Sequence, residues 1–438
     1  MRKMRDSGIA WIGVIPQDWE IVRTKSLYCS AKEIAGDRAD DFERLALTLN
    51  GVIKRSKEDS VGLQPEKFSG YQILKKGELV FKLIDLENVA TSRVGLSPYT
   101  GIVSPAYIVL SKQSRAKDLV VRYSMYHFLS MWQREVFNQM GDNGVRSSLN
   151  AKELLNIPHP FPSIYEQKRI VTFLDAQCAE IDAVLEKTRA SIEEYKKLKQ
   201  AVITQAVTKG IRGDRPMKDS GIEWIGDIPA EWRKTQLRHC AAIKSGITLG
   251  KKYEKTDSLV ERPYLRVANV QDGYVDLSVL TTIEVTQDED LKYRLRAGDV
   301  LMTEGGDRDK LGRGCVWHGE IEPCLHQNHI FAVQTSKDTL LPEFLEYLTV
   351  SDVGRSYFDV TAIKTTNLAC TSSSKVLAFT IPLPSVEEQA EIVEALNTKC
   401  AGIDALVAKK QQYLTEIENY KKSLIYEYVT GKKEAHPL

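Results

Sequence analysis

The pattern of hydrophobic and polar residues predicts two long helices. Residues 164–208 and 386–430 place apolar side chains three or four positions apart, which is the spacing of one helix face. At about 1.5 Å per residue, each helix would span roughly 65–70 Å. Because such an apolar stripe requires a partner, we expect the two helices to pack together in antiparallel orientation. The residues expected at their interface are Ile170, Leu174, Ile181, Leu185, Ile192, Ile392, Leu396, Ile403, Leu406 and Leu414.

The two predicted helices begin and end with the same local signals. An S-x-x-E spacing precedes each stripe and predicts a capping box, in which the glutamate reaches back to the capping residue. A glycine follows each stripe, as is typical of a helix C-terminus. The residues concerned are Ser163, Glu166 and Gly210 in the first helix, and Ser385, Glu388 and Gly431 in the second.

The remaining sequence predicts two mixed bodies. Short strand-like runs, such as residues 78–84 and 106–110, lie between clusters of Gly, Pro and Ser, without a βαβ rhythm. We therefore expect an α+β protein. Its expected divisions are residues 1–160 (first body), 161–212 (central helix), 213–383 (second body), 384–432 (second helix) and 433–438 (tail).

The sequence repeats itself in the same order. Residues 4–20 and 217–233 are identical at 11 of 17 positions, and residues 160–209 match residues 382–431 at 19 of 50 positions. Two such matches indicate a duplicated unit of about half the chain. A duplication of this kind predicts internal pseudo-two-fold symmetry.

Composition excludes some classes of protein and leaves others open. The 60 Lys and Arg residues balance the 59 Asp and Glu residues, so net charge argues neither for nor against a nucleic-acid partner. No run approaches the roughly 18 apolar residues of a membrane span, and the N-terminal residues lack the apolar core of a secretory signal. Seven scattered cysteines indicate reduced thiols. We therefore expect a cytoplasmic protein with no membrane partner.

Two repeated motifs resemble a known family. A mixed body that ends in PxPxxxEQxxI and continues into a long helix, with DSGIxWIGxIPxxW at its start, occurs twice. This arrangement is similar to the specificity subunit of type I restriction–modification systems. The resemblance implies two target-recognition domains that each read half of an asymmetric, bipartite sequence in double-stranded DNA, with the helices as a coiled-coil spacer. It also implies docking of two methyltransferase subunits and of restriction–translocase subunits.

The resemblance further implies that this chain has no cofactor of its own. S-adenosylmethionine, ATP and Mg would belong to the partner subunits. The bodies differ from each other where residues 104–107 read Ser-Pro-Ala-Tyr and residues 326–329 read His-Gln-Asn-His. We interpret this as divergence of the DNA-reading surfaces.

Four polar segments are candidates for DNA contact, because Gly permits close backbone approach while Arg, Lys, Ser, Thr and Asn can bond to phosphates or base edges. Each could instead be an ordinary solvated turn. The candidate residues in the first body are Lys54, Arg55, Lys57, Arg146, Ser147 and Ser148. Those in the second body are Arg308, Lys310, Arg313, Lys364, Thr365, Thr366 and Asn367.

Metal and catalytic sites are not expected. Five Cys and His residues between Cys315 and His329 have irregular spacing and fit an alternating strand pattern, so we expect no metal site. We also find no amino-methyltransferase signature, cofactor loop or hydrolase motif, and we expect no catalytic residues. Two alternatives remain: a coiled-coil adaptor that binds only protein, and a fused restriction–modification enzyme.

Overall fold

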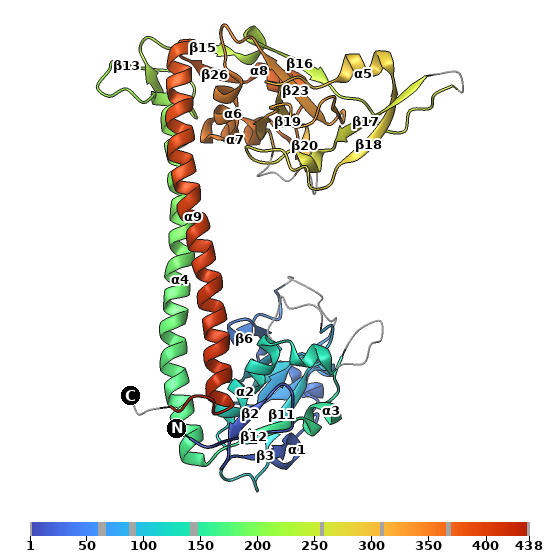
Figure 1. The fold of residues 1–438 in the computed structure, drawn as a ribbon, viewed down its shortest axis with the longest axis vertical. Helices are drawn as coiled ribbons and strands as arrows, with labels where there is room; N and C mark the ends of the chain where they lie inside the picture. Colours follow the sequence, from blue (N-terminus) through green and yellow to red (C-terminus); the bar gives the residue numbers. More distant parts are fainter. Residues whose placement is uncertain are drawn as a thin grey trace. The chain divides into compact units, whose positions relative to one another are not determined.

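The computed structural model describes residues 2–59, 67–86, 93–140, 148–254, 258–306, 311–364 and 369–435. The chain forms two compact units (Figure 1): unit 1 contains Met1–Arg189 and Gln412–Leu438, and unit 2 contains Ala190–Gln411. Both long helices, α4 (Ile164–Lys209) and α9 (Val386–Val429), contribute residues to both units. Each unit therefore combines one body with helical residues from both repeats.

Unit 1 has a mainly antiparallel body, and among its described strands β5 and β10 pair in parallel. One four-stranded sheet has the order β6 (Gly51–Arg55), β5 (Arg44–Thr48), β10 (Gly101–Val103), β7 (Gln72–Leu74). The other has the order β4 (Tyr28–Cys29), β11 (Ile108–Lys112), β8 (Leu79–Phe81), β9 (Val94–Leu96). Two strand pairs, β1 (Met4–Asp6) with β2 (Val14–Pro16) and β3 (Glu20–Arg23) with β12 (Pro158–Phe161), join helices α1 (Thr24–Leu27), α2 (Val121–Gln133) and α3 (Ala151–Asn156).

Unit 2 repeats the two strand pairs as β13 (Met217–Asp219) with β14 (Asp227–Pro229) and β15 (Arg233–Gln236) with β26 (Thr380–Leu383). Its largest sheet has the order β16 (Ala241–Ser245), β23 (Ile330–Thr335), β19 (Val300–Thr303), β21 (Gly314–Val316). Two three-stranded sheets follow: β18 (Thr281–Thr286), β17 (Leu259–Leu265), β22 (Leu325–His326), and β20 (Gly305–Gly306), β25 (Ala369–Cys370), β24 (Ile363–Lys364). The helices of this body are α5 (Gln287–Tyr293), α6 (Pro342–Val350), α7 (Asp352–Thr361) and α8 (Ser373–Ala378).

Short 3₁₀ helices connect these elements at η1 (Gly36–Asp41), η2 (Phe68–Gly70), η3 (Val136–Gln139), η4 (Leu237–His239) and η5 (Val267–Asn269). Within the described ranges, no helix is both long enough and apolar enough to cross a membrane. The observed mixture of helices and mainly antiparallel sheets confirms the predicted α+β class.

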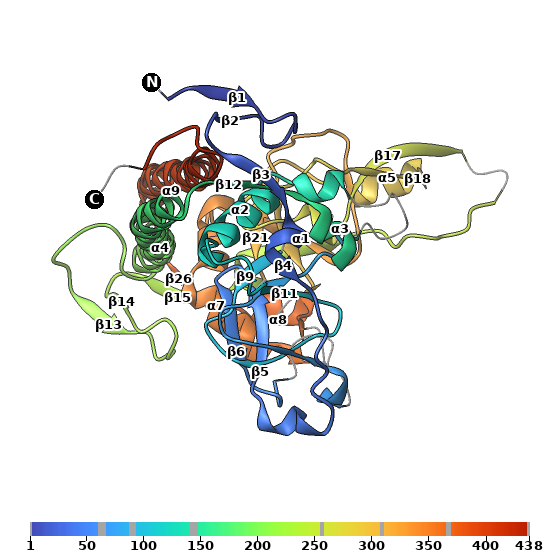
Figure 2. The same cartoon turned by 90° about the horizontal axis from the view of Figure 1, so that it is seen from below.

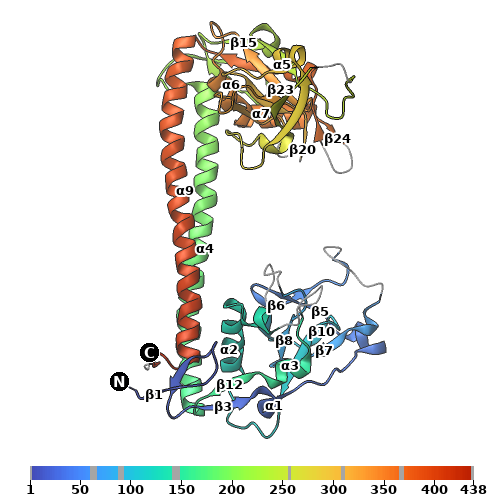
Figure 3. The ribbon, with the colours of Figure 1, turned by 45° about the vertical axis from the view of Figure 1, so that its right-hand side comes forward.

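The long helices run antiparallel within each unit (Figure 3). In unit 1, Lys421 bonds to Asp182 at 2.5 Å, and Arg189 bonds to Glu418 at 2.5 Å. In unit 2, Lys410 lies 5.6 Å from the Tyr195 ring, and Lys199 bonds to Asp404 at 2.7 Å. Residue numbers rise along one helix as they fall along the other in both units, as the sequence predicted.

Most of the expected interface residues are shielded from solvent. Ile181 is half-buried, and the prediction for Leu406 is wrong because its side chain is 45% exposed. After Ile403 the stripe advances by four residues to the half-buried Val407, not by three to Leu406. The buried members are Ile170, Leu174, Leu185, Ile192, Ile392, Leu396, Ile403 and Leu414.

The start of each long helix is fixed to its body by a buried glutamate. The hydroxyls of Ser163 and Ser385 accept the predicted backbone bonds, each at 3.3 Å. The predicted return bonds are replaced by other contacts: Glu166 accepts from the Trp19 indole at 2.9 Å, and Glu388 accepts from Trp232 at 2.9 Å. An arginine reinforces each contact, Arg2 on Glu166 and Arg215 on Glu388. A buried carboxylate favours these strong donors over one backbone amide.

The glutamine of each EQ motif connects the same helix start to another element of its body. Gln167 accepts from the amide of Val120, the residue before α2, at 2.8 Å and donates to the carbonyl of Asp118 at 3.0 Å. Gln389 accepts from the amide of Leu341, before α6, at 2.8 Å and donates to the carbonyl of Thr339 at 2.8 Å. Both glutamine side chains are buried, so each motif binds a helix start rigidly to its body.

The lead-in hairpin of each repeat packs over the helices. In unit 1, the β1–β2 hairpin lies beside the end of α9 (Figure 2), where the Tyr426 hydroxyl donates to the Ile12 carbonyl at 3.1 Å. Ile12, Ile15 and Trp19 share one apolar cluster with residues of both long helices. In unit 2, the equivalent Trp232 packs in the core that contains α4 and α9 residues.

Candidate nucleic-acid interface

In unit 2, the fold brings two of the predicted DNA-facing segments together. Strand β20 opens the segment of residues 305–314, and β24 lies in the segment of residues 362–367; both pair with β25. The Thr371 amide donates to the Glu304 carbonyl at 2.7 Å and closes the arrangement. A Cβ atom on Gly305 would lie 3.1 Å from the Cys370 sulfur, so this close approach favours glycine.

Unit 1 has the equivalent arrangement. An antiparallel bridge joins Ile84 to Ser148, and the Leu149 amide donates to the Leu83 carbonyl at 2.9 Å. Ser148 is exposed beside this bridge. Because the same backbone pairing recurs in both units, these two places are equivalent candidate surfaces.

Two described arginines of the unit 2 candidate surface lie near one carboxylate. Arg313 lies 4.0 Å from Asp272, and Arg355, on α7, lies 3.7 Å from the same carboxylate. To bind a phosphate, Arg313 would have to exchange this contact for the new one. Glu304, next to β20, pairs with His329 at 2.6 Å. Local sequence patterns do not reveal Arg355, Asp272 or the Glu304–His329 pair, because their partners are distant along the chain.

The predicted basic loop of unit 1 is also paired. Lys54 bonds to Glu43 at 2.5 Å, Arg55 bonds to Asp59 at 2.8 Å, and Lys57 donates to the Ala39 carbonyl at 2.9 Å. The hydrogen bond from Lys54 to Glu43 raises the pKa of Lys54, which keeps the ammonium charged. Exposed pairs of this kind are weak because water screens the charges, so a phosphate can compete for these cations.

Most of the other predicted contact residues lie outside the described residues. Lys364 is described through its backbone in β24 only. The residues outside are Arg146, Ser147, Arg308, Lys310, Thr365, Thr366 and Asn367.

The Cys and His residues between Cys315 and His329 are dispersed in the fold. Cys315, Cys324 and His326 are buried in the body, whereas His318 and His329 are exposed. The His326 ring bonds through Nδ1 to the Ile330 carbonyl at 3.0 Å, and burial lowers the pKa of His326 to about 4. In the part of the chain that the structure describes, no three His, Cys, Asp or Glu side chains form a group suited to a metal ion.

These features define a class of protein: a duplicated scaffold, in which two α+β bodies are fixed to a pair of long antiparallel helices. No family model matches the sequence. The type I restriction enzyme MjaVIII specificity subunit of Methanocaldococcus jannaschii is 25% identical over 431 residues, covering 95% of this chain and 93% of that protein. The EcoKI specificity subunit of Escherichia coli is 25% identical over 293 residues, covering 65% of this chain and 59% of that protein.

Solved structures agree on the fold. A chain from a study of complex assembly and conformational transition in the type I R-M system superimposes with a TM-score of 0.69 at 16% identity, covering 96% of this chain and 99% of that chain. The HsdS subunit from Thermoanaerobacter tengcongensis gives a TM-score of 0.50 at 15% identity, covering 96% and 98%. The chain is therefore similar over nearly its whole length to specificity subunits of type I restriction–modification systems, and it shares the fold of the solved ones.

Proposed function

We propose that this chain recognises an asymmetric, bipartite DNA sequence, with one half-site read by residues 1–160 and the other by residues 213–383. Residues 161–212 and 384–432 act as the spacer that fixes the distance between the half-sites. The observation that carries this proposal is the contrast between repeated docking contacts and divergent surfaces. Trp19, Glu166 and Gln167 have exact counterparts in the second repeat, whereas the candidate DNA-facing loops do not.

The contrast has a physical reason. Both bodies must attach to the same helical frame, so the attachment residues are kept alike. Each body reads its own bases, so its loops have no reason to match the other body. Two short half-sites at fixed separation then specify a long and rare target without one large continuous interface.

The chain would act within a larger assembly. We propose that two methyltransferase subunits and restriction–translocase subunits dock on it. Those partners would supply S-adenosylmethionine, ATP and Mg, and this chain would supply only the DNA sequence preference. Its balanced charge suggests that the partners also provide many of the phosphate contacts.

A methylome tests the proposal directly. The chain is expressed with the methyltransferase subunit of its system, and modified adenines are mapped by long-read sequencing with and without the chain. We expect a split, asymmetric motif that depends on the chain. An active methyltransferase without such a motif would favour the protein-binding adaptor instead.

Single substitutions then show which body of the protein reads which half-site of the DNA. Arg146→Ala should change or relax only the first half-site, and Lys364→Ala only the second. Lys187→Ala, at an exposed position of α4, is the control and should leave both half-sites unchanged. If either loop variant weakened binding to all DNA sequences equally, and its affinity depended less steeply on salt, that residue would contact a phosphate and would not read a base.

A further inference from the structure

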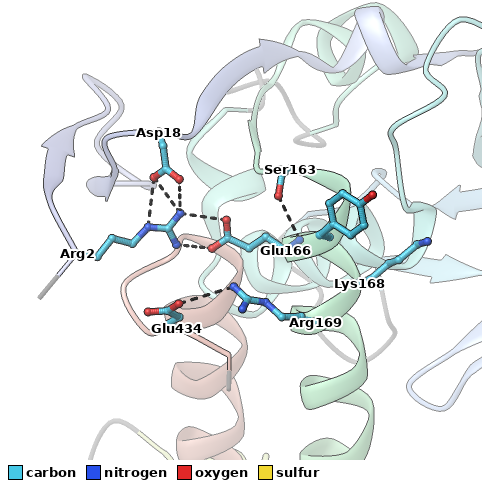
Figure 4. A pocket seen from close by; sticks show the side chains of 8 residues that line it. Arg2, Asp18, Ser163, Glu166, Lys168, Arg169 and Glu434 are labelled. Carbon is cyan, nitrogen blue, oxygen red and sulfur yellow. Dashed lines mark hydrogen bonds and ion pairs between the residues drawn. The ribbon is translucent and has the colours of Figure 1, made fainter. Parts of the chain in front are cut away.

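The start of each long helix contacts the segment that follows the other long helix. In unit 1, Arg169 on α4 lies 3.7 Å from Glu434, beyond the end of α9 (Figure 4). In unit 2, Glu391 on α9 accepts three bonds from Arg212, beyond the end of α4, at 2.7, 2.9 and 3.1 Å. We call these two contacts the tail pairs. Each tail pair joins one repeat of the sequence to the other.

The tail pairs have opposite polarity. Arg169 and Glu391 occupy the same position of the PxPxxxEQ-helix alignment, 222 residues apart, yet one is a cation and the other an anion. The tail residue that each one faces carries the complementary charge. If a tail docked on the helix of its own repeat, Arg212 would face Arg169 and Glu434 would face Glu391. Both alternatives bring like charges together.

A third pair between the helices shows the same asymmetry. Arg189 on α4 bonds to Glu418 on α9 at 2.5 Å. The residue of the first repeat that aligns with Glu418 is Lys196, so pairing the first repeat with itself would set Arg189 against a lysine. By contrast, the pairs Lys199–Asp404 and Lys421–Asp182 are equivalent in the two repeats. Those two pairs support the antiparallel register but cannot distinguish one repeat from the other.

The tail after α9 is held in place in unit 1. Ala435 is buried in the cluster that contains Ile12 and Trp19. Gly431 has a positive φ of 70°, and a Cβ atom there would lie 2.5 Å from Pro16. The backbone on both sides of Glu434 is therefore packed against unit 1, which keeps the Glu434 carboxylate near Arg169.

We propose that the reversed charges are a pairing code, which makes the two repeats of this chain pair with each other and reject the like repeat of a second copy. The surface at the start of α4 selects the tail with Glu434, and the start of α9 selects the tail with Arg212. Without such a code, two repeats with the same helical stripe could also pair across two chains, like with like. Because each pair is exposed, the selection is a sum of weak contacts that salt will screen.

Three double variants of the full chain test the code at constant net charge. R169E/E391R inverts it, so that both cross pairs become repulsive and both like-with-like pairs become attractive. R169E/E434R and R212E/E391R each contain one of the same substitutions together with its compensating partner. They restore both cross pairs and serve as matched controls. Thermal unfolding is measured at low and high salt, and tagged and untagged copies of each variant are co-expressed and purified on the tag.

The inverted variant should melt at a lower temperature than both controls at low salt, and the difference should shrink in 1 M salt. Its untagged copy should co-purify with the tagged copy, whereas that of the wild type should not. The two compensated variants leave the cross pairs and the like-with-like pairs attractive, so they are controls for stability only. Equal melting temperatures at low salt would overturn the proposal. A lower melting temperature without co-purification would also overturn it, since the charges would then stabilise the cross pair without selecting against a second copy.

Discussion

At the scale of single residues, the two repeats are anchored by contacts that local sequence patterns do not reveal. The tryptophan of the lead-in motif and the glutamate of the EQ motif are 147 residues apart in the first repeat and 156 in the second, yet they form one hydrogen bond in each unit. The arginine on each glutamate adds a buried charge pair. The capping-box prediction assigned Glu166 and Glu388 to a backbone bond at their own helix start. In the structure, these glutamates instead stabilise the attachment of each helix to its body.

Replacing the unit 2 glutamate should be costly. Glu388→Ala should lower the unfolding free energy by about 3 kcal/mol or more, because it leaves the nearly buried Arg215 without its buried carboxylate partner. Glu388→Gln retains an acceptor for Trp232 and should cost less, roughly 1–2 kcal/mol. Urea unfolding of the three proteins measures the effect. Glu231→Gln is the control: it alters the exposed partner of Arg215, and a loss equal to that of Glu388→Ala would contradict the assignment.

Buried histidines should make stability depend on pH. The His159 ring is fully buried, bonded through Nδ1 to the Pro160 carbonyl at 2.7 Å and through Nε2 to Ser124 at 2.9 Å. Burial lowers the pKa of His159 to about 4, and His326 in unit 2 has a similarly lowered pKa of about 4. At these two histidines, only the unfolded chain binds a proton between pH 6.5 and pH 4, so the stability that they contribute above pH 6.5 is lost as pH falls through this window.

The expected loss is about 3 kcal/mol per histidine over the whole window, since one pKa unit corresponds to about 1.4 kcal/mol. Urea unfolding at pH 7 and pH 4.5 measures it. His159→Gln should retain the hydrogen-bonding capacity and reduce the pH dependence of unit 1, while unit 2 keeps its own. Part of the dependence of unit 1 should remain, because burial also lowers the pKa of His127, which lies beside His159. An unchanged slope in this variant would show that His159 is not the titrating group.

At the scale of elements, periodicity predicted the long helices and their antiparallel pairing. It failed at Leu406 because apolar residues three and four positions apart both satisfy a helical stripe in sequence. The packing of the partner helix determines which of the two residues, Leu406 or Val407, faces the interface. The Pro-Ser sequence before each long helix and the glycine after it are also local signals. In the structure, α4 and α9 begin and end at these signals.

The two leucines of α9 offer a matched comparison. Leu396 is 1% exposed and packs in the core of unit 2, whereas Leu406 is 45% exposed on the same helix. Leu396→Ala should destabilise unit 2 by about 2–5 kcal/mol, because it removes buried surface and leaves a cavity. Leu406→Ala should change stability by less than about 0.5 kcal/mol. Similar losses in thermal or urea unfolding would place Leu406 in the interface after all.

At the scale of the whole molecule, the sequence repeats and the compact units divide the chain at different places. The duplication predicted two bodies with a helix each. The structure gives units whose boundaries fall inside α4 and α9, so each body is completed by helical residues of the other repeat. Nothing in the local pattern shows this exchange, because it depends on which helix end lies beside which body. The candidate DNA-facing loops were even less predictable, since the residues of a loop that reads a target would follow that target and not a packing rule.

This exchange predicts that the end of the chain stabilises its beginning. Thr430 and Ala435 are buried in unit 1, and the Tyr123 hydroxyl of α2 donates to the Val429 carbonyl at 2.9 Å. Deleting residues 430–438 should therefore speed hydrogen exchange in β2 and α2 at least about tenfold, equivalent to about 1.4 kcal/mol. The equivalent elements of unit 2, β14 and α6, contact the end of α4 instead and should keep their protection. Uniform loss of protection in both units would mean that the chain unfolds as a single cooperative body. No change in β2 and α2 would mean that the C-terminal residues are not part of unit 1.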